Sequence, residues 1–179
     1  MFDENFIKPN PLSILPDINC IKGPTREEHQ VSTVPSCEFH TRDGIQLLDK
    51  ETTTILLVQV VTTQPNQKVK LEATIPTLVN LNPAKTSTLF EVEYKLFRKA
   101  EGNVPQLLLF VPIYGNFKRA ISFAANVYYF YPNITWVDTP LKGTYSYFIT
   151  AYLSDYHIGF SSIWICKSAL IATIYPSSS

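Results

Sequence analysis

Cysteine and histidine residues near the start of the chain could hold a metal ion or form a disulfide bond. Cys37 and His40 are three residues apart, and Cys20 and His29 lie upstream of them. A structural zinc site needs paired ligands at short, repeated spacings, and this arrangement lacks them. We therefore interpret these residues as structural, and we expect no metal and no cofactor.

Groups that could act in hydrolysis are few. Asp155 and His157 flank Tyr156, but no serine stands in a nucleophile-elbow context. Glu91 and Glu93 share one face of an expected strand, where exposed acids are ordinary. The chain has only 6 glycines, scattered one at a time, so it has no glycine-rich phosphate loop. The sequence therefore predicts that the protein is not an enzyme.

The cysteine count is odd, at three. Cys166 lies in the strand-like run "SSIWICK" and is most simply a small buried apolar residue. Cys20 and Cys37 could form a disulfide bond within one chain or between subunits, or could remain thiols. The sequence leaves these alternatives open.

Length and charge narrow the classes of protein further. The chain has 179 residues, 45% hydrophobic content and a formal net charge of zero. This is enough for one buried core, and the absence of a basic cluster argues against binding nucleic acid. No apolar run reaches the roughly 18 residues that a membrane span needs. Because Asp3 and Glu4 stand where a signal peptide would be basic or apolar, we expect no secretory signal.

Residues 101–179 are rich in aromatic side chains and poor in charge. They include 17 of the 23 Phe, Tyr and Trp residues, but only 7 charged side chains. A dispersed monomer usually has a quarter to a third of its surface charged. Either a well-filled β core uses these aromatic residues, or several aromatic strand faces are buried against other copies of the chain.

Alternation of apolar and polar residues predicts strands. In "QKVKLEATIPT", Val69, Leu71, Ala73 and Ile75 share one face, and "FEVEYKLFR" and "TYSYFITAYL" show the same period of two. The second face of "TYSYFITAYL" is only partly polar, so we expect that strand to be covered on both sides. Further β-rich runs lie at 53–61, 105–114, 117–130, 134–138, 157–166 and 168–175.

Eight or so antiparallel strands in about 130 residues suit a two-sheet jelly roll. Residues 1–45 show little alternation and hold five of the 13 prolines. We therefore expect an all-β protein, with an antiparallel jelly-roll β-sandwich at 46–179 and an extended, Pro-rich N-terminal arm at 1–45.

The arm begins with "FDENFIKPNPLSILP", at residues 2–16. Its prolines remove backbone donors and favour extended geometry, so its large apolar side chains need a surface on which to dock. The candidate docking residues are Phe2, Phe6, Ile7, Pro9, Leu12, Ile14 and Leu15.

This stretch resembles the N-terminal leader of spore exosporium proteins of bacilli, whose pattern runs close to FDPNLVGPTLPPIP. Phe2, Asp3, Asn5 and Pro9 match it, and Leu12 and Ile14 match with an offset of one residue. Glu4 and Lys8 replace the Pro and Gly of the pattern, and the later prolines are spread out.

A second resemblance lies near the C-terminus. "WVDTPLKGTYSYFITAYL" followed by "SALIATIYP" is similar to the last strands of the jelly rolls of tumour necrosis factor and C1q, which many exosporium proteins carry. Those domains are trimers. In the exosporium family the leader directs the protein to the spore surface, and spores also carry appendage fibres whose small β-sandwich subunits are joined by N-terminal arms.

The resemblance implies a structural protein of the spore surface, made in the mother-cell cytoplasm. We expect a homotrimer that docks to its neighbours through the arm, giving a head-to-tail polymer or an anchor among other exosporium proteins, with no nucleic acid and no membrane as partner. The alternative is a ligand-binding jelly roll, either a carbohydrate-binding or a phage receptor-binding module, with exposed Tyr and Trp as stacking platforms.

Overall fold

The computed structural model describes residues 36–118, 127–154 and 158–177. Within those ranges the chain forms twelve β-strands and no α-helix. The strands are β1 (Ser36–Arg42), β2 (Ile45–Leu47), β3 (Thr52–Thr62), β4 (Lys68–Thr74), β5 (Thr77–Leu81), β6 (Ser87–Ala100), β7 (Gln106–Lys118), β8 (Val127–Phe130), β9 (Asn133–Asp138), β10 (Gly143–Leu153), β11 (Phe160–Ile165) and β12 (Ser168–Tyr175). In this part of the chain no helix is long and apolar enough to span a membrane.

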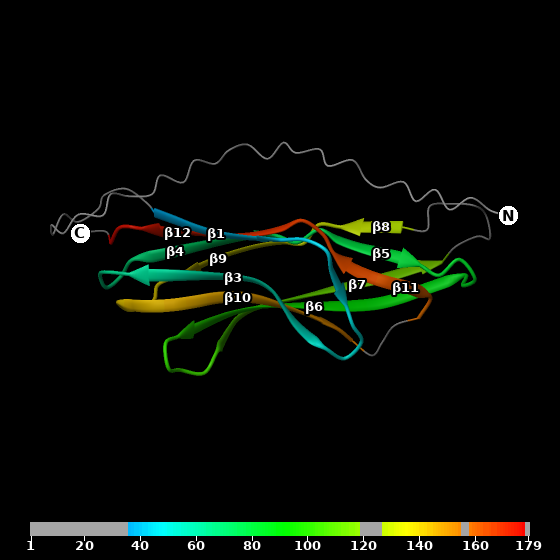
Figure 1. The fold of residues 1–179 in the computed structure, drawn as a ribbon, viewed down its shortest axis with the longest axis horizontal. Helices are drawn as coiled ribbons and strands as arrows, with labels where there is room; N and C mark the ends of the chain where they lie inside the picture. The colour runs from blue at the N-terminus through cyan, green and yellow to red at the C-terminus, as the bar shows by residue number, and fades with distance from the viewer. Residues whose placement is uncertain (1–35, 119–126, 155–157, 178–179) are drawn as a thin grey trace.

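The longest strands make one layer of a sandwich. Strands β3, β10, β6 and β7 pair in that order, and every pairing is antiparallel (Figure 1). We call this layer the long sheet. β3 and β7 are its edges, and β3 also contacts β1 and β12 of the other layer.

The other layer consists of two four-stranded sheets with corresponding orders, β1-β12-β4-β9 and β2-β11-β5-β8. Strands at the same position in the two orders follow one another in the chain, and two residues separate them. The four such pairs are β1 and β2, β11 and β12, β4 and β5, and β8 and β9. The layer therefore behaves as four long antiparallel strands that are all interrupted at one level.

Prolines explain two of these interruptions, because proline cannot donate a ladder hydrogen bond. Pro76 separates β4 from β5, and Pro132 separates β8 from β9. Their carbonyls still accept across the gap: Ile75 N donates to Pro132 O at 3.0 Å, and Cys166 N donates to Pro76 O at 2.8 Å. The layer bends at this level without leaving these groups unpaired.

The alternating apolar residues predicted to face the core are buried between the layers. They are Val69, Leu71, Ala73, Ile75, Phe90, Val92, Tyr94, Leu96, Tyr145, Tyr147, Ile149, Ala151 and Leu153. Each large side chain of this kind contributes about 1.5–3 kcal/mol by leaving water. The period-two pattern therefore placed these strand faces correctly, and the all-β, antiparallel sandwich follows from it.

One aromatic contact in the core depends on a glycine. Phe90 on β6 packs against Phe130 on β8, with ring centroids 5.4 Å apart, and against Phe117 on β7, at 6.1 Å. A Cβ at Gly115 would lie 2.1 Å from the Phe90 ring. Glycine at this position lets the ring lie directly against the backbone of β7.

The structure differs from the sequence expectations at two places. β1 pairs with β12 along seven residues, so residues 36–42, which the sequence assigned to the arm, belong to a sheet of the sandwich. The second face of β10 was expected to be covered, and Thr150 on that face is 6% exposed, but Phe148 and Tyr152 on either side of it are only half-buried. The neighbouring side chains of the long sheet cover their flanks, and the described part of the chain leaves their outer surface open.

Candidate functional site

The expected docking residues of the arm lie outside the described residues, as does Cys20. Their roles therefore remain predictions. Cys37 lies on β1 and is disulfide-bonded, whereas Cys166, in the gap between β11 and β12, is a free thiol. Burial, with a smaller effect of Asp43, raises the pKa of the Cys166 thiol. The sequence predicted a small buried apolar residue here, and the structure leaves Cys166 half-buried.

The most distinctive surface is the outer face of the long sheet. Phe148 on β10 lies in register with Leu57 on β3 and with Phe97 on β6, and Phe97 is in register with Leu107 on β7. We call these four residues the apolar row. The Phe97 and Phe148 rings stack with centroids 5.2 Å apart, while Leu57 and Leu107 at the two ends are 43% and 49% exposed. An apolar stripe thus crosses the whole sheet.

Lys95 lies next to this row. Its Nζ contacts Oε2 of Glu93 at 2.6 Å and lies 5.4 Å from the centre of the Phe110 ring and 5.9 Å from that of Tyr152. Phe110 is 42% exposed. The aliphatic part of the Lys95 side chain extends the apolar surface. Its ammonium group pairs with Glu93 and makes cation–π contacts with Phe110 and Tyr152.

A second apolar surface runs along one side of the sandwich, where β7, β8 and β9 are the edge strands of their sheets. The Phe117 and Tyr128 rings stack at 4.5 Å and join β7 to β8. Exposed residues flank this edge on both sides: Tyr114 lies on the outer face of the long sheet, in register with Glu91, whereas Val127, Tyr129 and Val137 lie on the outer face of the other layer, with Tyr131 stacked beside Tyr129. We call these five residues the aromatic edge.

Large exposed apolar surfaces on a soluble protein usually mark interaction sites. Tyr114 of the aromatic edge lies on β7, a 13-residue edge strand. A long edge strand offers unpaired backbone groups to another chain. All five residues of the aromatic edge lie in the charge-poor part of the sequence. The two surfaces are thus suited to contacts between protein chains.

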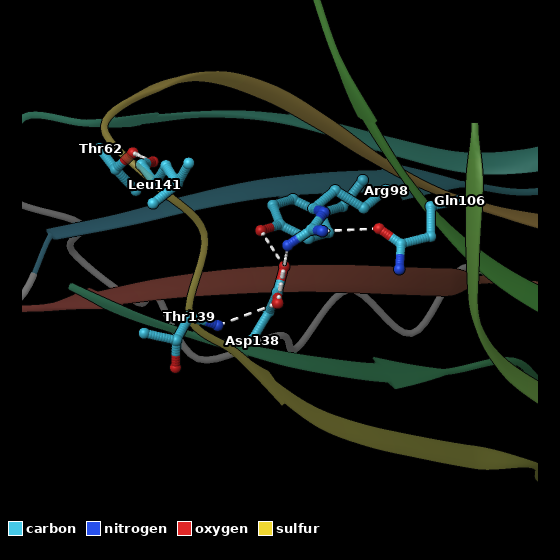
Figure 2. A network of polar contacts seen from close by, with 7 residues as sticks. Thr62, Arg98, Gln106, Asp138, Thr139 and Leu141 are labelled. Carbon is cyan, nitrogen blue, oxygen red and sulfur yellow. Dashed lines mark hydrogen bonds and ion pairs between the residues drawn. The ribbon is translucent and has the colours of Figure 1, made fainter. Parts of the chain in front are cut away.

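A polar network closes one end of the sandwich (Figure 2). Arg98 Nη1 donates to Oδ1 and Oδ2 of Asp138 at 3.0 and 2.8 Å, and Arg98 Nη2 donates to Oε1 of Gln106 at 2.6 Å. Tyr147 Oη donates to Asp138 Oδ2 at 2.7 Å. Asp138 belongs to β9, whereas the other three residues belong to the long sheet. The network therefore ties the two layers together.

The adjoining loop is fixed by Thr62, which is 1% exposed. Its Oγ1 donates to the carbonyl of Leu141 at 2.6 Å (Figure 2). The same oxygen accepts from the backbone N–H of Gly143 at 3.1 Å. Thr139 N also donates to Asp138 Oδ1, at 2.9 Å. The connection from β9 to β10 is thereby held against the end of the long sheet.

The chemistry of this network favours a structural role. Burial, followed by the hydrogen bond to Asp138, raises the pKa of Tyr147 well above its usual range. The phenol therefore stays protonated at neutral pH and donates its proton to a carboxylate that also pairs with a guanidinium. A pocket of about 280 Å³ adjoins the network, with Arg98, Asn103 and Tyr145 among its lining residues. The guanidinium of Arg98 in this lining is already hydrogen-bonded to Asp138 and Gln106.

This network was not predicted from the sequence, although the sequence holds a signal for it. Arg98 has the same parity as the inward-facing residues of its strand, and Asp138 has the same parity as Ile134, which is 2% exposed. Charged residues at inward positions need partners. Arg98 and Asp138 are charged, face inward and lie near the ends of different strands, which is typical of residues that form an ion pair. The sequence does not show that these two strand ends lie together; the fold does.

The other candidates from the sequence have structural contacts. His40 Nδ1 accepts a hydrogen bond of 3.4 Å from the backbone N–H of Leu57, which links β1 to β3. Glu93 pairs with Lys95, and Glu91 accepts a hydrogen bond from Tyr114 that raises the pKa of that phenol. Asp155 and His157 lie outside the described residues. Within the described ranges, no group of three or more His, Cys, Asp or Glu could hold a metal ion.

No protein-family model and no curated protein matches this sequence. Among solved structures, it is similar to part of infectious bursal disease virus, Gx strain, at 10% identity and a TM-score of 0.48 over 79% of this chain and 32% of that one. It is also similar to dimeric latent PorU from Porphyromonas gingivalis, at 10% identity and a TM-score of 0.41 over 83% and 14%. The chain spans about a third or less of these proteins, and likeness at this level carries no argument about function.

Proposed function

We propose that this protein is a structural, self-assembling subunit of the bacterial spore surface, in the exosporium or in an appendage fibre. In this proposal the sandwich trimerises, and the N-terminal arm docks to neighbouring subunits. The observation that carries the assembly role is the pair of exposed apolar surfaces, the apolar row and the aromatic edge. The spore location is supported by the resemblance of residues 2–16 to the exosporium leader.

We assign the sandwich to the jelly-roll type. The order β3-β10-β6-β7 in one layer supports this assignment, as do the four interrupted strands of the other layer. Counting each interrupted strand once gives eight strands, as in a jelly roll. A jelly roll of the tumour necrosis factor or C1q type accounts for the proposed trimer.

We place the trimer contact at the aromatic edge. Its side chains are exposed in one chain, and Tyr and Val lose little conformational entropy when they are buried. Oligomer interfaces are enriched in aromatic residues and depleted of charge at their centre. A trimer would bury the aromatic edge of each of its three subunits. It would also keep the long edge strand β7 from pairing with other chains.

The arm supplies the contact between trimers. Its anchors are Phe2, Phe6, Ile7, Leu12 and Ile14, and its prolines lower the entropy lost on docking. Because donor and acceptor are different surfaces of one chain, the contact is heterologous and stacks subunits head to tail. Three arms per trimer add avidity.

Removal of residues 2–15 from the full chain tests the proposal. This deletion leaves β1, which begins at Ser36, intact. We expect the full chain of 20.3 kDa to form polymers in negative-stain images, and the deletion variant, which is 14 residues shorter, to form only trimers by light scattering. Monomers in both samples would contradict the assembly function, and polymers from the deletion variant would limit the arm to targeting.

A ligand-binding jelly roll is the second candidate. Tyr129 and Tyr131, with rings 6.3 Å apart and 17° from parallel, form an exposed pair on which sugar rings could stack. Glycan array binding that survives the arm deletion and is lost on replacing both tyrosines by serine would favour this candidate over assembly.

A further inference from the structure

We propose that the outer face of the long sheet, along β6, is the acceptor for residues 3–8 of the arm of another subunit. The inference rests on the proposed function, because it identifies the surface that a docking arm needs. It also separates the two apolar surfaces of the chain, since the aromatic edge is assigned to the trimer and the apolar row to the arm.

Apolar matching is the first support. Phe97 and Phe148 stack at the centre of the row, and the exposed Leu57 and Leu107 close its two ends. In an extended arm Phe6 shares a face with Glu4 and Lys8, whereas Ile7 points to the other side, so Phe6 is the large apolar side chain that would lie on this row. Burial of such groups between subunits is the ordinary source of affinity in an interface of this kind.

Charge order is the second support. The outward-facing residues of β6 run in the order Glu91, Glu93, Lys95, Phe97 and Lys99. The lysines thus stand beside Phe97, and the acids lie farther along the strand. The arm has acids first, then apolar residues, then a base: Asp3, Glu4, Phe6, Ile7 and Lys8, so its acids are complementary to Lys99 on one side of Phe97.

These two orders fix a direction for the arm. With Phe6 over Phe97, Glu4 lies level with Lys99, and Lys8 lies level with Lys95, from where it can reach the Glu93 carboxylate that pairs with Lys95. Lys8 is two residues from Phe6, which is about 7 Å in an extended arm, whereas Glu93 is four residues from Phe97, which is about 13 Å. The flexible lysine side chains close the difference.

A narrow segment suits this face better than a second sheet. The Lys95–Glu93 pair lies at the side of the apolar row, and its side chains are 33% and 20% exposed. A flat partner would remove this ion pair from water, which is costly. An arm one strand wide can cover the row and leave the pair hydrated at its margin.

The length of the arm allows the contact. Between Lys8 and Ser36, where β1 begins, there are 27 residues, which span up to about 90 Å when extended; a disulfide between Cys37 and Cys20 would leave the 12 residue steps from Cys20 to Lys8, about 40 Å. β1 is in the layer opposite the long sheet. An arm from another subunit reaches the face directly, whereas an arm from the same chain would first pass around the sandwich.

Mixing two defective variants of the full chain tests the assignment. The donor variant carries Phe6→Ser and Ile7→Ser. The acceptor variant carries Leu57→Thr and Phe97→Thr, which suit exposed strand positions. We expect each variant alone to give trimers without polymers. The equimolar mixture should give pairs of trimers of doubled mass, because one variant retains the donor and the other retains the acceptor. Phe39→Thr, at a residue 62% exposed on β1, serves as the control and should polymerise normally.

A charge exchange gives a second readout that does not depend on apolar packing. Lys99→Glu should raise the concentration needed for polymerisation by about tenfold, since repulsion replaces attraction in each of three arms. Combining it with Asp3→Lys and Glu4→Lys should restore assembly. Lys68→Glu, an exposed change on β4, should have little effect.

The outcomes separate the acceptor from the function. If the donor variant polymerises normally, the proposed role of the arm is wrong. If the donor variant fails but the acceptor variant polymerises at normal length, only the acceptor assignment is wrong. Failure of the mixture to pair, with both variants folded by circular dichroism, also overturns the assignment. Pairing of the donor variant alone would identify face-to-face contact between copies, and the arm would not be the occupant.

Discussion

Arg98 on β6 and Asp138 at the end of β9 come from opposite layers and meet across the end of the sandwich, with two contacts of 2.8 and 3.0 Å between Nη1 and the carboxylate. Their side chains are 23% and 13% exposed. The same carboxylate accepts from Tyr147. This pair therefore joins the two layers at the end of the apolar core, where the side chains are partly exposed to solvent.

Asp138→Ala should lower the free energy of unfolding by about 2–4 kcal/mol, because it leaves a half-buried guanidinium and a buried phenol without their acceptor. Urea unfolding followed by tryptophan fluorescence measures this loss. Glu72→Ala, which breaks the exposed pair with Lys70, should leave the midpoint nearly unchanged. Equal losses in the two variants would refute a special role for the network.

Alkaline conditions should destabilise the fold. Burial raises the pKa of Tyr94 and of Tyr147 above the usual value of about 10. Above that pH the unfolded chain binds fewer protons than the folded one, so stability is intact below about pH 10 and falls as the pH rises further. Urea titrations from pH 8 to 11 should show this fall, and it should be smaller in Tyr94→Phe.

Tyr94→Phe should also cost about 1 kcal/mol at neutral pH. The variant loses the buried 2.6 Å hydrogen bond to Thr77. Thr77 keeps a second bond, from Oγ1 to the carbonyl of Ile75 at 3.0 Å, which limits the loss. A loss of several kcal/mol would mean that the ring itself had moved.

Gly115→Ala should destabilise the protein by about 1–3 kcal/mol, since its Cβ would overlap the Phe90 ring. Phe90→Leu should itself cost stability by removing contacts with Phe117 and Phe130. The double variant should lose less than the sum of the two, and a double-mutant cycle of thermal unfolding measures this coupling. Simple additivity would show that the ring and the glycine are not in contact.

The cysteines should divide into two classes. Cys166 should react slowly with a thiol reagent at neutral pH in the folded protein, because burial raises its pKa and limits access. In unfolded, unreduced protein, one thiol per chain should react, because Cys37 is disulfide-bonded, Cys166 is free, and Cys20 is the remaining cysteine. Peptide mapping without reductant identifies the pair, and a linked Cys20–Cys37 peptide absent from the map would contradict it.

The aromatic edge should control the trimer. Tyr129→Ser with Tyr131→Ser should convert the arm-deleted trimer to monomers, because both rings leave the proposed contact. Light scattering at micromolar concentration gives the mass. The matched change Phe39→Ser removes an equally exposed ring from β1 and should leave a trimer. A monomeric mass for the arm-deleted protein before any substitution would contradict the trimer.

The sequence by itself determined the class of fold and the inner faces of the strands. In an antiparallel sandwich one face of each strand meets the core, so a period of two in residues such as Val69, Leu71 and Ala73 states which side is buried. Strands β3, β9, β10 and β12 lie within one residue of the expected runs. β1, β2 and β5 were missed, since they are short or half-exposed and their pattern is weak.

Only the tertiary structure decided which residues meet across the sandwich. Pairing between strands far apart in the chain brought Arg98 to Asp138, and it aligned Leu57, Phe148, Phe97 and Leu107 into one row. Alternation gives the face of each residue but not the neighbour of its strand, because the order of strands in a sheet depends on contacts between distant segments. The candidate acceptor surface is a property of that order, and no local pattern contains it.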